Sequence, residues 1–283
     1  MDFLQSVWYQ ILWFFTIYSF LGWCVEVCFC SIVTRKWVNR GFLNGPVCPI
    51  YGFGMLIIVT TLTPLKHNPI LLFLGAMILC SVLELVTGYV LKKLFHTSWW
   101  DYSDEKFQIG GYICLKFSIM WGLGGMAALY ILHPVVEKIV TAAQNRFGLV
   151  LLILCMVLFV ADGIVTLNTI AKLNRNLGEI TRLTKLLHST SDTIAENLGE
   201  NALSAYDKYE EKKAEFSQKK EALSDTAQTR YAELTNKVNA LRAELQEAKM
   251  FGTARLIKAF PKIKSNQYAE ALEEIRKYFH RKK

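Results

Sequence analysis

Four ionisable side chains interrupt the long apolar runs of this sequence: Glu26, Glu84, Lys116 and Asp162. A charge at membrane depth costs roughly 2.5–3.5 kcal/mol, so such residues usually face the inside of a helix bundle and often bind a ligand or an ion. Because three acids accompany one base, we predict that a loop cation enters the cluster, that one carboxyl group is protonated, or that a cation is bound. The alternative is a structural set of ion pairs, with Glu26 and Lys116 extending to the membrane surface.

Small and polar neighbours favour inward faces for these charges. Ser19, Gly22 and Glu26 recur at helical spacing, and so do Ser81 and Glu84. Residues three or four apart lie on one face of a helix. The charges are therefore expected to point into the bundle.

The first loop between apolar runs offers further polar groups. It carries Arg40 and Asn44 within residues 39–49, a stretch that also contains two glycines and two prolines. These residues break a simple helix, and non-helical backbone is tolerated at membrane depth only where protein or water covers it. Transporters commonly build substrate sites at broken helices, so we predict a non-helical or re-entrant segment that contributes to the site.

The third loop places Trp99, Trp100 and Tyr102 around Asp101. Such aromatic residues suit the lipid headgroup interface. Asp101 is expected to cap a turn or to accept a hydrogen bond from a cation such as Arg40, and an aromatic surface with one acid also suits a cationic or amphiphilic ligand. The predicted ligand or ion pocket comprises Glu26, Arg40, Asn44, Glu84, Asp101, Lys116 and Asp162.

The elements that position these residues are predicted to be membrane-spanning helices. The chain is 52% hydrophobic and 20% charged, with a mean hydropathy of +0.24, and its two halves differ sharply in character. A helix crosses the bilayer with about 20 apolar residues. The first apolar run is interpreted as a retained span rather than a cleavable signal peptide. The predicted spans are roughly residues 7–30, 43–63, 69–91, 112–132 and 148–168.

The predicted fold class is therefore all-α, a polytopic membrane bundle of about five helices followed by a cytoplasmic helical or coiled-coil tail. Basic residues concentrate in the first and third loops and at the start of the tail. That bias places the N-terminus outside and the C-terminus in the cytoplasm of a bacterial cell membrane, with all four buried charges in the cytoplasmic half. The predicted domains are 1–168 (transmembrane), 169–250 (charged, helical or coiled coil) and 251–283 (basic and amphipathic).

The tail shows a short heptad seam that includes Leu173, Ile180 and Leu187. A dimeric coiled coil and a helix folding back on its neighbour both fit that spacing. Basic residues then alternate with apolar ones after residue 252, a pattern typical of a segment on the anionic inner leaflet, although docking on a partner fits equally. The residues expected to contact anionic lipid are Arg255, Lys258, Lys262 and Lys264.

Several site classes are not expected. The seven cysteines form no CxxC pair, which argues against a zinc site or a disulfide framework. No P-loop, HExxH or GxSxG motif occurs, so an enzyme is not favoured and neither a metal nor a cofactor is predicted. The net charge of +8 is attributed to membrane orientation and lipid contact rather than to nucleic-acid binding.

Several motifs resemble a known family. They are Ser19–Glu26, Asn39–Pro46 running into Cys48–Gly54, Glu84 with Thr87-Gly88, Trp99–Ser103, and Cys114–Ser118 with Trp121-Gly122. Together they resemble the bacterial family labelled putative ABC-transporter permease, type IV. The resemblance implies a transport channel driven by a separate ATPase subunit, and about five spans would then require a homodimer. The rival functions are a membrane-anchored sensor or scaffold acting through the tail, and an intramembrane enzyme that modifies lipid.

Overall fold

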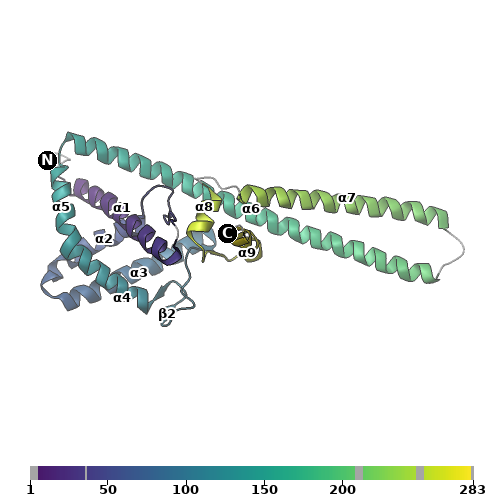
Figure 1. Ribbon diagram of the computed structural model, residues 1–283, viewed down its shortest axis with the longest axis horizontal. Helices are drawn as coiled ribbons and strands as arrows, with labels where there is room; N and C mark the ends of the chain where they lie inside the picture. Colours follow the sequence, from purple (N-terminus) through teal and green to yellow (C-terminus); the bar gives the residue numbers. More distant parts are fainter. Residues whose placement is uncertain (1–5, 36, 208–212, 247–251, 282–283) are drawn as a thin grey trace. The chain divides into compact units, whose positions relative to one another are not determined.

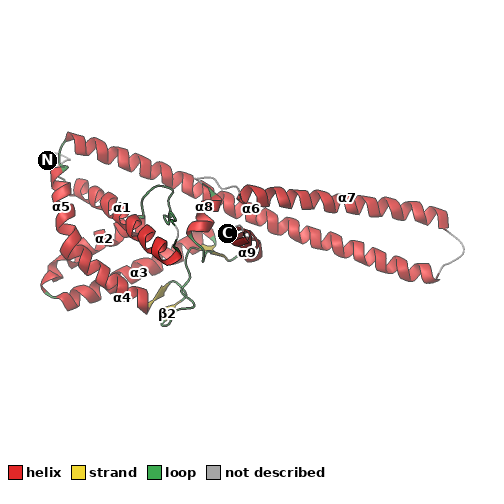
Figure 2. Cartoon of the chain, in the orientation of Figure 1, coloured by secondary structure: helices red, strands yellow, loops and turns green. Residues whose placement is uncertain are grey.

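The computed structural model is predominantly helical in the residues that it describes, which are 6–35, 37–207, 213–246 and 252–281 (Figure 2). It separates into two compact units. The first contains Met1–Ala171 with Met250–Asn266, and the second contains Lys172–Lys249 with Gln267–Lys283. Each unit combines two segments that are distant in the chain, whereas the domains predicted from the sequence are continuous. Those domain limits therefore stay predictions.

Five helical segments are long and apolar enough to cross a membrane, which confirms the all-α membrane class. The fourth of them changes to a π-helix (η3) between α4 and α5. The segments are α1 (Val7–Thr34), α2 (Pro49–Leu62) with η2 (Thr63–His67), α3 (Pro69–Phe95), α4 (Leu115–Ala127) with η3 (Ala128–Leu132) and α5 (His133–Ala142), and the apolar first part of α6 (Arg146–Asp207).

Local signals set several helix ends. The Ser6 side chain accepts a hydrogen bond from the Tyr9 amide, and Asn68 does the same for α3 from the Leu71 amide at 3.1 Å. Side-chain oxygens at this position satisfy backbone donors that the first helical turn leaves free. At the other ends, Arg35 and His96 adopt left-handed backbone conformations, with φ of 52° and 53°, which terminate α1 and α3.

The chain between α1 and α2 returns along α1. Residues 37–48 are non-helical, and the Cys48 amide donates a 2.8 Å hydrogen bond to the Ser19 carbonyl near the middle of α1. The helical part of the second span therefore begins at Pro49 rather than near residue 43, which confirms a non-helical approach to this span, whereas its re-entrant course stays a prediction. Gly22 makes this packing possible because it lies directly against the Tyr51 side chain.

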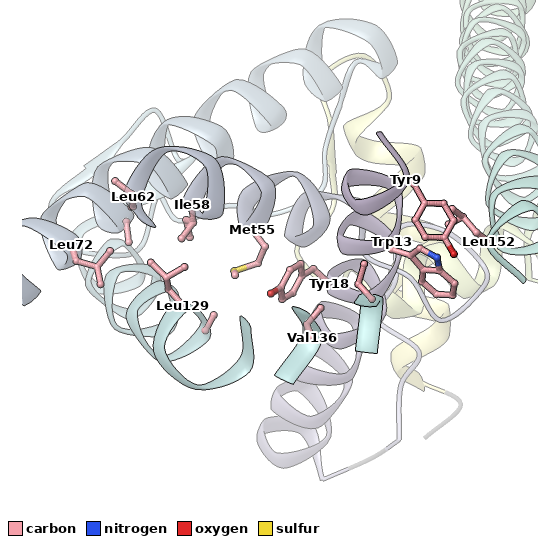
Figure 3. Packing of buried hydrophobic residues seen from close by; sticks show 13 residues of the cluster. Tyr9, Trp13, Tyr18, Met55, Ile58, Leu62, Leu72, Leu129, Val136 and Leu152 are labelled. Carbon is pink, nitrogen blue, oxygen red and sulfur yellow. The ribbon is translucent and has the colours of Figure 1, made fainter. Parts of the chain in front are cut away.

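A buried apolar cluster joins the spans. It runs from Leu62, Leu72 and Leu129 at one end to Tyr9 and Leu152 at the other (Figure 3). Two tyrosine hydroxyls inside it have partners: the Tyr9 hydroxyl donates to the Ala143 carbonyl at 2.5 Å, and the Tyr18 hydroxyl lies 2.9 Å from Nδ1 of His133.

The segment between α3 and α4 contains three short strands, β1 (Thr97–Ser98), β2 (Gln108–Ile109) and β3 (Ile113–Cys114). β2 and β3 form an antiparallel hairpin, and its turn uses Gly110 and Gly111 at φ of 60° and 74°, a conformation that glycine adopts at little cost.

A distant part of the chain completes the first unit. After α8 (Thr253–Ala259), β4 (Lys264–Ser265) pairs antiparallel with β1, placing Thr97 opposite Ser265. Residues 252–266 are thus bound to the loop between α3 and α4.

The second unit combines the later part of α6 with α7 (Lys213–Gln246) and α9 (Ala269–Arg281). α7 runs back alongside α6 (Figure 1), and the two helices are joined by a 2.6 Å ion pair between Lys172 and Glu244. Leu173 and Ile180, two residues of the predicted seam, are buried. Within one chain the tail therefore forms a helical hairpin, and a dimeric coiled coil stays a prediction.

We predict that Gly22→Ala weakens the packing of α1 on α2. A Cβ atom at Gly22 would lie 2.2 Å from Cγ of Tyr51, and overpacking costs about 1–3 kcal/mol. The apparent melting temperature in detergent should fall by roughly 5 °C, measured by size-exclusion chromatography after heating. Gly163→Ala is the matched control, because a Cβ there meets no atom within 4 Å. Equal melting temperatures of the two variants would contradict the close contact between Gly22 and Tyr51.

Candidate functional site

A cavity of about 330 Å³ lies among α1, α2, α3, α4 and η3. Most of its wall is apolar. Three ionisable side chains, Glu26, Arg40 and Glu84, also line it, together with Tyr51, Tyr102 and Trp121, whose polar atoms bind the two carboxyl groups. The apolar wall includes Leu21, Val25, Met55, Ile58, Leu83, Met120 and Leu132.

Glu26 and Arg40 form an ion pair in this cavity. Nε of Arg40 lies 3.2 Å from Oε2 of Glu26, and the Tyr51 hydroxyl donates to Oε1 at 2.7 Å. Burial acts to lower the pKa of Arg40, but the Glu26 carboxylate, Cys30 and Tyr102 together outweigh it, so that the pKa is raised and the guanidinium stays charged. The loop thus supplies the cation that three acids were expected to require.

Glu84 accepts hydrogen bonds from neutral donors. The Tyr102 hydroxyl donates to Oε1 at 3.0 Å and the indole N–H of Trp121 donates to Oε2 at 3.1 Å, while the Glu84 side chain is 5% exposed. Among the residues whose side chains the structure describes, no lysine, arginine or histidine forms an ion pair with it. Burial and the adjacent Glu84 raise the pKa of Tyr102, so its hydroxyl remains a donor.

The connection between α3 and α4 fixes the position of Tyr102. The Tyr102 amide donates to the Gly111 carbonyl at 2.9 Å, and the Trp100 indole donates to the Tyr112 carbonyl at 2.9 Å. The β2–β3 turn thereby holds both aromatic residues, and the Tyr102 ring stacks on Phe117 at 4.7 Å between centroids.

Asp162 belongs to a different polar group, which holds the loop between α1 and α2. Oδ1 accepts from the Asn44 amide at 3.0 Å and from its side-chain nitrogen at 2.9 Å, and Oδ2 accepts from the Gly45 amide at 2.7 Å. Asn44 also donates to Thr166 at 3.0 Å. Neither Asp162 nor Asn44 lines the cavity, so their contact with a ligand stays a prediction.

Arg255, on α8, binds the same loop. Its two terminal nitrogens donate to the carbonyls of Gly41 at 2.9 Å and Phe42 at 3.1 Å. Burial lowers the pKa of Arg255, partly offset by the charge of Asp162. Trp99 packs edge-on against the rings of Phe42 and Phe260, at 5.0 and 5.2 Å.

The interfacial role predicted for Trp99 does not fit its environment. Its side chain is 3% exposed and is covered by protein. Trp100 and Tyr102 are half-buried, each with a polar partner inside the unit.

Asp101 pairs with Lys264 rather than with Arg40. It also accepts from the Ser103 hydroxyl and, at 2.9 Å, from the Ser103 amide. Burial acts to raise the pKa of Asp101, but the bonds from Lys264 and Ser103 outweigh it and lower the pKa to about 2.

Lys116 does not reach the buried acids. It lies in the first turn of α4, its side chain is 62% exposed, and it pairs with Glu105 at 3.3 Å. The four charges expected in one cluster are therefore separated: Glu26 and Glu84 share the cavity, Asp162 holds the loop, and Lys116 lies outside both groups.

Most of the basic residues predicted to contact lipid have partners in the protein. Arg255 binds two carbonyls, Lys262 lies 3.5 Å from Asp104, and Lys264 pairs with Asp101. Lys258 is exposed. Lipid contact at these positions stays a prediction.

Sequence reasoning missed Tyr51 and Trp121 as partners of the two carboxylates. Both are aromatic residues with a polar tip inside an apolar run, and such residues usually find a hydrogen-bond partner when buried. The presence of a polar tip on an aromatic residue inside an apolar run indicates that Tyr51 and Trp121 have hydrogen-bond partners. It does not indicate which carboxylate is the partner.

We predict that Asp162→Asn loosens the loop between α1 and α2. An amide offers one acceptor oxygen where the carboxylate serves the donors of Asn44 and Gly45, and a hydrogen bond to a charged group contributes about 1.5–3 kcal/mol. Alkylation of Cys48, which is 7% exposed, should accelerate roughly tenfold or more, measured by peptide mass spectrometry. Asp192→Asn, at an exposed position of α6, should leave the rate unchanged; equal rates in both variants would refute the role of Asp162.

A second prediction concerns acid pH. Because the pKa of Asp101 is depressed from 3.8 to about 2, its carboxylate stabilises the fold fully above about pH 4, and this contribution is lost as the pH falls through 2. Asp101→Asn should lower stability by on the order of 1–2 kcal/mol at pH 6. The difference from wild type should narrow between pH 4 and pH 2 in thermal melts. The Asp104 side chain is 85% exposed, so Asp104→Asn should have nearly the stability of wild type at every pH. A stability difference between Asp101→Asn and wild type that does not change with pH would contradict the prediction.

Comparison with known proteins adds the family. No solved structure matches this chain at a significant level. A family model described as "Putative ABC-transporter type IV" matches residues 13–167, more than half of the 283 residues. The match includes all five candidate spans in whole or in part. The protein is therefore a multi-pass membrane protein that belongs to the putative ABC-transporter type IV family.

Proposed function

We propose that the protein is a permease-like transport component whose ligand occupies the cavity between α1 and α4. The observation that carries this proposal is a cavity with apolar walls that also contains a buried carboxylate, Glu84, bound only by neutral donors among the described residues. Ionisable groups facing the interior of a membrane bundle commonly mark a substrate or ion pathway.

The broken second span supports the same proposal. α2 begins beside the middle of α1, and the non-helical chain before it delivers Arg40 to the cavity. Discontinuous helices near the bilayer midplane form the substrate sites of many transporters.

We further propose that the tail lies in the cytoplasm and that a separate ATPase subunit binds it. The basic loops favour this orientation, and the sequence contains no P-loop of its own. A homodimer would supply the number of spans that a permease requires.

A sensor or scaffold acting through its tail is the second candidate. Asp162 on α6 and Arg255 on α8 precede and follow residues 172–249 in the chain, and both bind the loop at residues 41–45. Deletion of residues 172–249 should then abolish the sensor or scaffold activity, while Glu84→Gln should preserve that activity. The transport proposal expects Glu84→Gln to impair activity.

We predict that filling the cavity blocks transport. A Cβ at Gly124, which lines the cavity, meets no atom within 4 Å, so Gly124→Leu should place its side chain in the empty space. Inside-out vesicles would be incubated with a ¹³C-labelled metabolite and lipid extract, with ATP or with a proton gradient, and analysed by mass spectrometry. We expect at least one compound to accumulate roughly tenfold less with Gly124→Leu than with wild type.

Gly163→Leu is the matched control, since Gly163 is equally open but does not line the cavity. Dependence on ATP would support an ATPase partner, and dependence on the proton gradient would support a carrier. Equal accumulation of every compound in wild type, Gly124→Leu and empty vesicles would refute the transport proposal.

A further inference from the structure

We propose that the cavity binds a lipophilic cation, an ammonium group joined to an apolar body. This inference rests on the proposed transport function and names the chemical class of its ligand. The ammonium would lie by Glu84 and the aromatic rings beside it, and the apolar body would lie along α2.

Charge in the cavity favours a cation. Two carboxylates, Glu26 and Glu84, line the cavity with one guanidinium, Arg40. Arg40 is paired with Glu26 at 3.2 Å, whereas Glu84 receives only neutral donors from the described residues. An isolated buried carboxylate is costly unless it is paired or protonated. A ligand ammonium would balance that charge, while an anionic group would enter a cavity in which two carboxylates outnumber one guanidinium.

Aromatic rings reinforce the preference. Tyr51 meets Trp121 edge-on at 5.2 Å between centroids, and Tyr102 stacks on Phe117 at 4.7 Å. All four line the cavity. The faces of such rings attract ammonium groups, most strongly when water is excluded.

The apolar wall accommodates the remainder of the ligand. Along α2 the lining extends from Ile50 to Ile58, which corresponds to about 12 Å of helix. Ligand cavities usually enclose roughly 300–1,000 Å³, so the volume of about 330 Å³ suits a slender molecule.

The test uses the full-length protein in phosphatidylglycerol nanodiscs, which carry no ammonium headgroups. Decyltrimethylammonium and decanesulfonate are titrated by calorimetry, with empty nanodiscs subtracted. These probes share an apolar chain and differ in the sign of the head. We expect saturable binding of the ammonium and none of the sulfonate, a comparison that needs no variant.

Glu84→Gln should weaken binding of decyltrimethylammonium at least tenfold. Glu137→Gln is the matched control, because Glu137 is exposed on α5 and does not line the cavity; it should bind like wild type. Melting curves would confirm that both variants are folded. Equal binding of the sulfonate, no saturable binding of the ammonium, or an unchanged affinity in folded Glu84→Gln would overturn the inference.

Added phosphatidylethanolamine identifies the source of the ammonium. Competition with decyltrimethylammonium would assign the site to an aminophospholipid, and a lack of competition would assign it to a free lipophilic amine. Failure of this inference is distinguishable from failure of the transport proposal. Accumulation of an anionic compound in the vesicles would refute only the choice of ligand, whereas ammonium binding without any accumulation would refute only transport.

Discussion

Residues 37–48 lie beside a membrane-spanning helix without the hydrogen bonds of a helix, and hydrocarbon cannot satisfy their peptide groups. Protein groups meet that requirement. Asp162 accepts from two backbone amides of the loop, the Ser19 carbonyl accepts from Cys48, and Arg255 donates to two carbonyls. A buried peptide group without a partner costs several kcal/mol, so these bonds determine the course of the loop and with it the start of α2.

The charge distribution in the cavity follows from that loop. Arg40 precedes Gly41, whose carbonyl Arg255 binds, and it pairs with Glu26. Glu84 is consequently left with the hydroxyl of Tyr102 and the indole of Trp121. The cavity thus contains one acid paired with a cation, Glu26, and one acid without a described cation, Glu84. This difference follows from the hydrogen bonds that hold the loop backbone.

The sequence predicts the spans and the broken approach to α2 well, because both depend on composition and on glycine and proline within one segment. It predicts the site less completely. Helical spacing indicates which face of its own helix a residue occupies, but not which neighbouring helix that face meets, so spacing alone does not separate Asp162 and Lys116 from Glu84. The partner of Asp101 is Lys264, 163 residues later in the chain, and no local periodicity encodes such a contact.

The pairing of β1 with β4 also determines the order in which the first unit can fold during synthesis. The loops around the cavity emerge from the ribosome early, whereas Arg255 and Lys264 follow α7. Roughly 80 residues separate the two chain segments of the first unit. At ordinary rates of translation, they take on the order of ten seconds to synthesise. During that interval the carbonyls of Gly41 and Phe42 lack the guanidinium that later binds them. The membrane unit can therefore reach its final hydrogen-bonded state only after the tail has been made, and a chain interrupted within the tail would leave the cavity framed by incomplete loops.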